Sequence, residues 1–122
     1  MMDAPRPQLG DIQAAAGRLS GFAVRTPLLE SPLLNQQLGG RLLVKPECLQ
    51  LTGSFKFRGA FNKISQLTPD ELERGVIAFS SGNHAQGVAA AAHMKGTQAV
   101  IVMPKDAPRI KIDNTRAWGA EV

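Results

Sequence analysis

Short apolar runs and helix-forming segments alternate along the second half of the chain, and this alternation is the feature that most constrains the fold. The pattern predicts strands at residues 76–79, 99–103 and 121–122, and helices at residues 83–95 and 108–118. Gly96 and Gly119 follow the two helices and mark where they end. Strands separated by helices pair in parallel through right-handed crossovers, so we expect an α/β fold with a parallel sheet. The run 99–103 is apolar throughout, so we expect both faces of this strand to be covered.

The first half of the chain predicts short helices with recognisable start and stop signals. We expect a loose tail at residues 1–8, an amphipathic helix at 11–20, short strands at 28–29 and 41–45, and a loop at 46–54. Ser31-Pro32 and Thr68-Pro-Asp-Glu71 each combine an N-cap residue with a proline in the first turn, which is typical of a helix start. Gly39-Gly40 and Gly75 are expected to end these two helices.

Size and charge place the chain among ordinary small domains. It has 122 residues and a formal net charge of +4, a mild positive balance that suits an anionic cofactor and a carboxylate substrate. The basic residues are scattered, there is no Tyr and there is one Trp, so we expect no nucleic-acid partner. No apolar run approaches the roughly 20 residues of a membrane span, and the N-terminus has no apolar signal-peptide core. We therefore expect no membrane partner and a cytoplasmic location.

Metal and thiol chemistry find little support in the sequence. Cys48 is the single cysteine, so no disulfide can form within the chain. His84 and His93 are nine residues apart, which does not match the spacing of zinc proteases, and we expect no metal site. Nothing near Cys48 supports a nucleophilic thiol, so we expect it to be a small buried apolar residue.

A lysine follows a Thr-Gly-Ser turn at the start of another expected helix, which begins near residues 54–55. The spacing of Phe57, Phe61 and Ile64 places these three side chains on the buried face of this helix, and Lys56 lies about a quarter-turn away from them. A lysine must be neutral to attack an aldehyde, and a low-dielectric site favours the neutral form. The flanking phenylalanines suit such a site. The stretch therefore predicts a lysine that can be held close to a bound carbonyl cofactor.

A second motif lies between an expected strand and the helix at 83–95. It consists of five residues, Ser80, Ser81, Gly82, Asn83 and His84. The start of a helix presents free backbone N–H groups and a partial positive charge, which favour a carboxylate or a phosphate. A plain Ser and Asn helix cap is the alternative that these residues leave open. The Gly82–Gly87 spacing resembles that of a nucleotide P-loop, but the Gly-Lys-Ser/Thr ending is absent.

Taken together, the two motifs resemble the fold-type II pyridoxal-phosphate (PLP) enzymes, in the branch of the serine/threonine dehydratases and serine racemases. The positions that match the family's lysine motif are Glu47, Gln50, Thr52, Gly53, Ser54, Phe55, Lys56, Arg58, Gly59 and Ala60. The resemblance runs from Arg25-Thr-Pro-Leu28 to Gly119-Ala-Glu-Val122 and so covers nearly the whole chain. It implies a three-layer αβα fold like that of the tryptophan synthase β-subunit, here truncated. Residues 1–45 would contribute to a large domain, and residues 46–122 would form most of a small domain.

The resemblance also implies a role for each site residue. Lys56 would hold PLP as an internal aldimine and later act as the base at the α-carbon of the substrate. Phe55 would pack against the cofactor ring, and Asn83 would hydrogen-bond its 3′ oxygen. The substrate carboxylate would be gripped by the loop Ser80, Ser81, Gly82, Asn83 and His84. In racemases of this type the serine at position 81 is also the acid/base on the opposite face.

The reaction that the resemblance implies is β-elimination from a small hydroxy amino acid. PLP acts as the electron sink, and threonine or serine gives a 2-oxo acid and ammonia. The family supplies its phosphate loop and its ligand to the pyridine nitrogen from positions past residue 122, and the chain ends on the first residues of an expected strand. We therefore expect a fragment, or a prematurely ended copy, of a longer enzyme that forms a homodimer or homotetramer. The 122 residues alone are expected to be inactive.

Several alternatives stay open. Serine racemase and hydroxyaspartate dehydratase share the motifs of this stretch. A regulatory or binding module that keeps the fold without catalysis is an alternative of another class, although the presence of Lys56 and Asn83 argues against it. A nucleotide-binding α/β domain is disfavoured because the glycine fingerprint is missing.

Besides Lys56, three basic residues are candidate ligands of an anion. Arg58 is a candidate phosphate ligand, but we expect it to form a salt bridge or lie at the surface, and we expect the same of Lys45 and Lys111. Trp118, near a helix end, is expected in the core.

Overall fold

The structure, a computed structural model, describes residues 6–122. Its helices are α1 (Leu9–Leu19), α2 (Pro32–Leu38), α3 (Lys56–Ile64), α4 (Pro69–Arg74), α5 (Asn83–Lys95) and α6 (Arg109–Ala117), with a 3-10 turn η1 (Glu47–Leu49). Its strands are β1 (Leu29–Glu30), β2 (Leu43–Val44), β3 (Val76–Phe79) and β4 (Ala99–Val102). The expected tail at residues 1–8 lies partly outside the described residues. Residues 6–8 have no regular structure.

The parallel sheet predicted for the second half of the chain is confirmed. β3 and β4 pair in parallel, with Val76 opposite Ala99 and Phe79 opposite Val102. Glu121 continues the sheet on the other side of β4 through a parallel bridge to Val100. The strand order along the sheet therefore follows the order in the sequence, as expected for consecutive right-handed crossovers.

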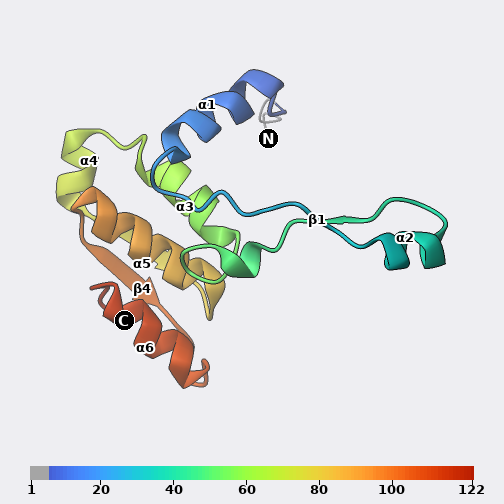
Figure 1. Cartoon of the computed structure of the whole chain (residues 1–122). Helices are drawn as coiled ribbons and strands as arrows, with labels where there is room; N and C mark the ends of the chain where they lie inside the picture. Colours follow the sequence, from blue (N-terminus) through green and yellow to red (C-terminus); the bar gives the residue numbers. More distant parts are fainter. Residues whose placement is uncertain (1–5) are drawn as a thin grey trace.

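Helix α5 is the centre of the core. All of its residues from 85 to 92 are buried, and it packs against α3, α6 and both strands of the parallel sheet (Figure 1). The small alanine side chains allow these elements to approach α5 from several directions. The opposing surface of α3 carries Phe57, Phe61 and Ile64, which are all buried as the spacing predicted. Phe22, in the turn after α1, stacks on Phe61 with ring centroids 4.4 Å apart.

One face of the parallel sheet stays open in the part of the chain that the structure describes. Ala99 and Ile101 of β4 face α5 and are 4% and 1% exposed. The alternate side chains of both strands are solvent-exposed, namely Ile77, Phe79, Val100 and Val102. The expectation that both faces of this strand are covered is therefore not met within residues 6–122. The fold class is unaffected, because the parallel order and the helical layer on the other face are both present.

Residues 27–45 form an arm that extends away from the body of the molecule (Figure 1). β1 and β2 pair antiparallel at the base of the arm, with Leu29 opposite Val44. α2 lies at its tip, where the Ser31 side chain accepts a hydrogen bond from Leu34 N–H, 3.4 Å between donor and acceptor. The apolar side chains of the arm are exposed, namely Leu28, Leu29, Leu33, Leu34, Leu38, Leu42, Leu43 and Val44.

Most of the predicted helix boundaries are confirmed. Thr68 and Glu71 form the expected capping box of α4, with Thr68 N–H donating to Glu71 Oε2 over 2.8 Å. The predicted bounds of α5 and its end at Gly96 agree with the structure. The loop at 46–54 differs from the prediction because it contains the turn η1. Among the helices of residues 6–122, none combines the length and the apolar character needed to cross a membrane.

One prediction about a single residue is wrong, and another is met in part. Cys48 is exposed, not buried, because it lies in the surface turn η1. Trp118 is partly buried and packs against the core, and its ring meets His93 edge-on with ring centroids 5.8 Å apart.

Candidate functional site

The turn before Lys56 is held in place by its own backbone and side-chain hydrogen bonds. Gly53 has φ of 71°, a left-handed conformation that glycine adopts without steric cost, and its N–H donates to Gln50 O over 2.7 Å. The Ser54 hydroxyl then accepts a hydrogen bond from Lys56 N–H over 3.4 Å. The predicted Thr-Gly-Ser turn is therefore present, and Lys56 follows it as the first residue of α3.

The two phenylalanines that flank Lys56 have opposite environments. Phe57 is fully buried against the core, whereas Phe55 is 59% exposed. The Lys56 ammonium lies over the Phe55 ring, 5.1 Å from its centroid. Lys56 itself is exposed within residues 6–122. The sequence predicted that both phenylalanines would line the environment of Lys56. Only Phe55 lies beside it, because Phe57 is directed into the core.

The second motif meets the first through Gly87. A Cβ atom at Gly87 would lie 3.1 Å from both Lys56 C and Phe57 N, and 3.2 Å from Lys56 O. Asn83 precedes Gly87 by four residues on α5, so the two share one face of the helix about 6 Å apart along its axis. Asn83 therefore lies about one helical turn along α5 from the residue that contacts the Lys56 backbone.

The loop Ser80–Asn83 closes the carboxyl end of β3. Ser80 N–H donates to Val102 O over 3.1 Å, which ties the loop to the neighbouring strand. The Ser80 hydroxyl accepts a hydrogen bond from Gly82 N–H over 3.2 Å. Ser81 and Asn83 are exposed. In open α/β sheets, ligands bind outside the carboxyl ends of the strands, which is where this loop lies.

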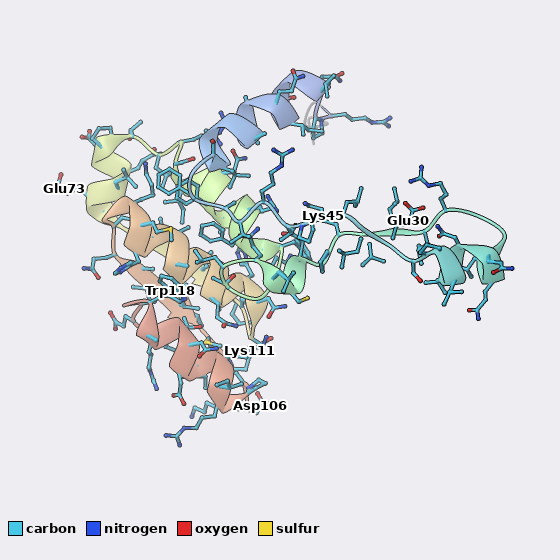
Figure 2. All side chains as sticks on the ribbon, viewed as in Figure 1. Glu30, Lys45, Glu73, Asp106, Lys111 and Trp118 are labelled. Atoms are coloured by element: carbon cyan, nitrogen blue, oxygen red, sulfur yellow. The ribbon has the colours of Figure 1, made fainter. Side chains whose placement is uncertain are left out.

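Lys111, which is labelled in Figure 2, joins this loop from α6. Its ammonium donates a hydrogen bond to Asn83 Oδ1, and its side chain lies 4.0 Å from the position of a Cβ at Gly82. This contact was not predicted from the sequence, where Lys111 is expected to form a salt bridge or lie at the surface. No local pattern reveals it, since Asn83 lies 28 residues earlier in the chain. The start of α5 thus combines a helix N-terminus with a cation, an arrangement that attracts anions.

Arg58 does not reach toward the loop but pairs with Glu47, which confirms the expectation of a salt bridge. Arg58 Nε donates to Glu47 Oε2 over 2.7 Å, and Arg58 Nη2 donates to Glu47 Oε1 over 2.7 Å. Thr26, which is buried, donates its hydroxyl to the same carboxylate over 2.6 Å. The hydrogen bonds from Arg58 are the largest cause that lowers the pKa of Glu47 from 4.5 to about 2, and the hydrogen bond from Thr26 adds to this effect. Partial burial of the carboxylate opposes the shift.

The same network fixes the segment before β1 against the lysine turn. The Gln50 side chain accepts from Val24 N–H over 2.8 Å and donates to Val24 O over 2.9 Å. The Lys45 ammonium donates a hydrogen bond to the backbone oxygen of Thr26 over 2.9 Å, so its hydrogen-bond partner in the structure is the backbone of the chain. The matching positions Glu47, Gln50 and Arg58 therefore hold the scaffold of the site.

His84 is set apart from the other predicted site residues. It lines a cavity of about 410 Å³ between α3, α4 and β3, and neither Lys56 nor Asn83 lines this cavity. The loop therefore brings together Ser80, Ser81, Gly82 and Asn83 with Lys111, while His84 faces a separate space. The expected contact of His84 with the substrate carboxylate remains a prediction.

The donors gathered at the site fit the chemistry of PLP. A primary amine can bind the aldehyde, a side-chain amide can donate to the ring's 3′ oxygen, and Phe55 offers an exposed aromatic face for the ring. Gly82 leaves open space at the loop, because only the Lys111 side chain lies within 4.0 Å of a Cβ built there. The residues present therefore fit the cofactor that the sequence motifs predicted.

Comparison with known proteins identifies the family. The sequence matches the family described as "Pyridoxal-phosphate dependent enzyme" over residues 19–122. It is 53% identical over 112 residues to an L-threo-3-hydroxyaspartate ammonia-lyase of Pseudomonas sp, covering 92% of this chain and 35% of the relative. The chain therefore spans about a third of the length of such relatives.

Solved structures show the same relationship. The threonine deaminase of T.th. superposes with a TM-score of 0.84 and 52% identity, over 95% of this chain and 36% of that one. The serine racemase from Dictyostelium discoideum superposes with a TM-score of 0.90 and 40% identity, over 94% of this chain and 38% of that one. The expected cofactor is the one in the family's description, and the predicted fold is that of these structures. The chain belongs to the pyridoxal-phosphate dependent enzyme family.

Proposed function

We propose that the chain is the N-terminal part of a PLP-dependent ammonia-lyase that eliminates water from threonine or serine, giving an enamine that water then hydrolyses to a 2-oxo acid and ammonia. The observation that carries the proposal is the contact of Gly87 with the Lys56 backbone, which joins the lysine motif to the Asn83 loop. When bound, PLP supplies the electron sink for the α-carbon of the substrate. Side chains of this chain are proposed to attach the cofactor and to hold the substrate carboxylate.

Lys56 is proposed to attach the cofactor and then to carry the α-proton. Its ammonium lies at the protein surface over the Phe55 ring, within reach of a ligand that stacks on this ring. Asn83 is proposed to donate its amide N–H to the ring's 3′ oxygen. Gly87 supports both roles, because it lets α5 approach the first turn of α3 closely enough for the two side chains to face one ligand.

The Ser80–Asn83 loop is proposed to hold the substrate carboxylate. The first N–H groups of α5 and the hydroxyl of Ser81 offer hydrogen bonds, and the helix N-terminus offers a partial positive charge. Lys111 adds a full positive charge at the same place, and within residues 6–122 no carboxylate forms a salt bridge with it. Two positive features that converge without an acidic partner favour an anionic ligand.

The domain division and the assembly belong to the same proposal. Residues 1–45 are proposed to contribute to a large domain, and residues 46–122 to form most of a small one. The exposed leucines of the arm support this division, since they offer an apolar surface to further protein. A homo-oligomer and a cytoplasmic location complete the proposal, and light scattering and cell fractionation would test them.

Two related activities are the alternatives within the enzyme class. Hydroxyaspartate ammonia-lyase is favoured by the relative that is 53% identical, and serine racemase by the exposed Ser81, which lies in the loop at the carboxyl end of β3. Product analysis with threonine, serine and 3-hydroxyaspartate separates the three. A racemase would convert L-serine to D-serine and lose this activity on Ser81→Ala, whereas a lyase would release ammonia.

The test of the proposal is reductive labelling. The 122-residue chain and a full-length chimera, in which residues 1–122 replace the matching part of the T.th. threonine deaminase, would be mixed with PLP and reduced with borohydride. Peptide mapping by mass spectrometry should find the label on Lys56 of the chimera, and Lys56→Ala should abolish it. Labelling of the 122-residue chain would show whether it retains a working pocket. A folded chimera without selective label would leave a module that keeps the fold without the chemistry.

A further inference from the structure

The Asn83 side chain can face a ligand in two ways, and Lys111 selects one of them. An asparagine amide has an acceptor oxygen on one side and a donor NH₂ group on the other, and rotation about its last bond exchanges them. Lys111 can only donate hydrogen bonds. The atom of Asn83 that faces the Lys111 ammonium is therefore Oδ1, and this hydrogen bond is present in the structure.

The selected orientation leaves the NH₂ group of Asn83 available. Within residues 6–122, no acceptor takes a hydrogen bond from Asn83 Nδ2, whereas Oδ1 is occupied by Lys111. A cofactor oxygen that bears negative charge needs a donor and would be repelled by Oδ1. The direction in which the amide points thus decides whether Asn83 favours or disfavours such a ligand.

The position of Lys111 is itself defined by its surroundings. Lys111 lies in the first turn of α6, and Asn83 in the first turn of α5, and these two helices pack against each other. The Thr115 hydroxyl, which is fully buried, donates to Lys111 O over 2.7 Å and ties the backbone of this residue to the next turn of α6. The backbone of Lys111 is therefore held within a helix, which limits the positions that its ammonium can reach.

We propose that Lys111 is a positioning residue that holds the Asn83 amide with its NH₂ group toward the 3′ oxygen of PLP. The proposal rests on the proposed function, because it assumes that PLP is the ligand of Asn83. It predicts that Lys111 influences cofactor binding through Asn83 and not through a contact of its own. Arginine at position 111 would keep a donor toward Oδ1, and methionine would remove it while keeping an unbranched side chain.

The first arm of the test needs no cofactor. In the ¹⁵N-labelled 122-residue chain, Lys111→Met should shift the side-chain NH₂ signals of Asn83, because their amide loses the hydrogen bond at Oδ1. Lys105→Met is the matched control, since Lys105 is an exposed lysine shortly before α6 with no hydrogen bond to Asn83 within the described residues. Unchanged Asn83 signals in Lys111→Met, with the fold intact by circular dichroism, would contradict the proposal.

The second arm measures PLP affinity in the full-length chimera described above. Lys111→Met should weaken PLP binding about 3- to 10-fold, the effect of one net hydrogen bond, and shift the absorbance band of bound PLP. Lys111→Arg should restore binding to within about twofold, and Lys105→Met should leave it unchanged. In an Asn83→Ala background, Lys111→Met should change binding by less than about twofold, because the amide through which it acts is gone.

The outcomes separate this proposal from the proposed function. If the unmodified chimera takes no label on Lys56, the proposed function fails and the role of Lys111 fails with it. If the chimera labels Lys56 but Lys111→Met binds PLP normally, the role of Lys111 alone is wrong. An equal loss in the presence and absence of Asn83 would show that Lys111 contacts the ligand directly, which also overturns the positioning role.

Discussion

Gly87 of α5 lies against the backbone of Lys56, so that a methyl group at Gly87 would come within 3.1 Å of the Lys56 carbonyl carbon. The contact joins two segments that the sequence presents separately, the turn that carries the lysine and the helix that begins at Asn83. Its tightness makes the position of Lys56 depend on the absence of a side chain at residue 87.

We expect substitutions at Gly87 to displace Lys56. Gly87→Val should destabilise the chain by about 1–3 kcal/mol, because α3 must move away from α5 to make room. The same change should weaken PLP labelling of Lys56 in the chimera, and Gly87→Ala should have the same effects to a smaller extent. Urea unfolding and label yield by mass spectrometry measure the two effects.

Gly17→Ala is the control for this prediction. Gly17 also lies inside a helix, α1, but a Cβ there would meet no atom within 4 Å. Alanine at this position should stabilise the chain by about 0.5–1 kcal/mol through helix propensity and leave labelling unchanged. Equal behaviour of the Gly17 and Gly87 variants would show that the close contact has no influence on Lys56.

The Glu47–Arg58 pair should make stability depend on pH in the acid range. The pKa of Glu47 is about 2 in the folded chain, below its ordinary value of 4.5, chiefly because Arg58 donates hydrogen bonds to it. A lowered folded-state pKa means that the contribution is complete above pH 4.5 and is lost as the pH falls toward 2. The loss should amount to at most about 3 kcal/mol.

Glu47→Gln isolates this contribution. Its free energy of unfolding, measured in urea from about pH 7 down to about pH 2, should fall less steeply than that of the unmodified chain. Glu30 and Glu71, whose pKa values are also lowered, by Arg41 and by Thr68 respectively, contribute equally to both proteins. Parallel curves for the two proteins would rule out a folded-state role for the Glu47 charge.

The phenylalanines on either side of Lys56 should respond differently to truncation. Phe57→Ala should cost about 3–5 kcal/mol of stability, because Phe57 is fully buried in the core. Phe55→Ala should cost less than about 0.5 kcal/mol, because Phe55 is mostly exposed, yet it should weaken PLP binding by removing the ring that is proposed to pack against the cofactor. Thermal unfolding and PLP titration of both variants in the chimera check this prediction. A Phe55 variant with normal PLP affinity would remove Phe55 from the proposed site.

The exposed apolar face of the β3–β4 sheet should make the 122-residue chain prone to self-association. Ile77→Thr combined with Phe79→Thr should reduce dye binding and self-association measured by light scattering, since both side chains are more than 70% exposed. Stability should change by less than about 1 kcal/mol, because threonine retains strand propensity. Ile101→Thr, on the buried side of β4, is the contrasting variant and should destabilise by about 2–4 kcal/mol.

The sequence motifs predicted the elements well where local chemistry decides them. The capping box at Thr68, the proline at the start of α2 and the glycine at the end of α5 act within one or two turns of the chain, so their effects can be read from neighbouring residues. The exposure of Cys48 was mispredicted because its apolar character says nothing about the surface turn in which it lies. The open face of β4 was mispredicted because a continuous apolar run shows which faces are apolar and not what covers them within this chain.

By itself, the sequence determined the family, the alternation of strands and helices, and the identity of Lys56 and Asn83 as candidate site residues, because these depend on local spacing and on motifs. The tertiary structure alone decided which residues meet. Gly87 supports Lys56, Lys111 binds Asn83 and Arg58 binds Glu47 rather than a ligand. Each of these contacts joins different elements, and packing of α5 against α3 and α6 brings two of them together. Such contacts follow from the fold as a whole, since no periodicity within one element records its partner on another.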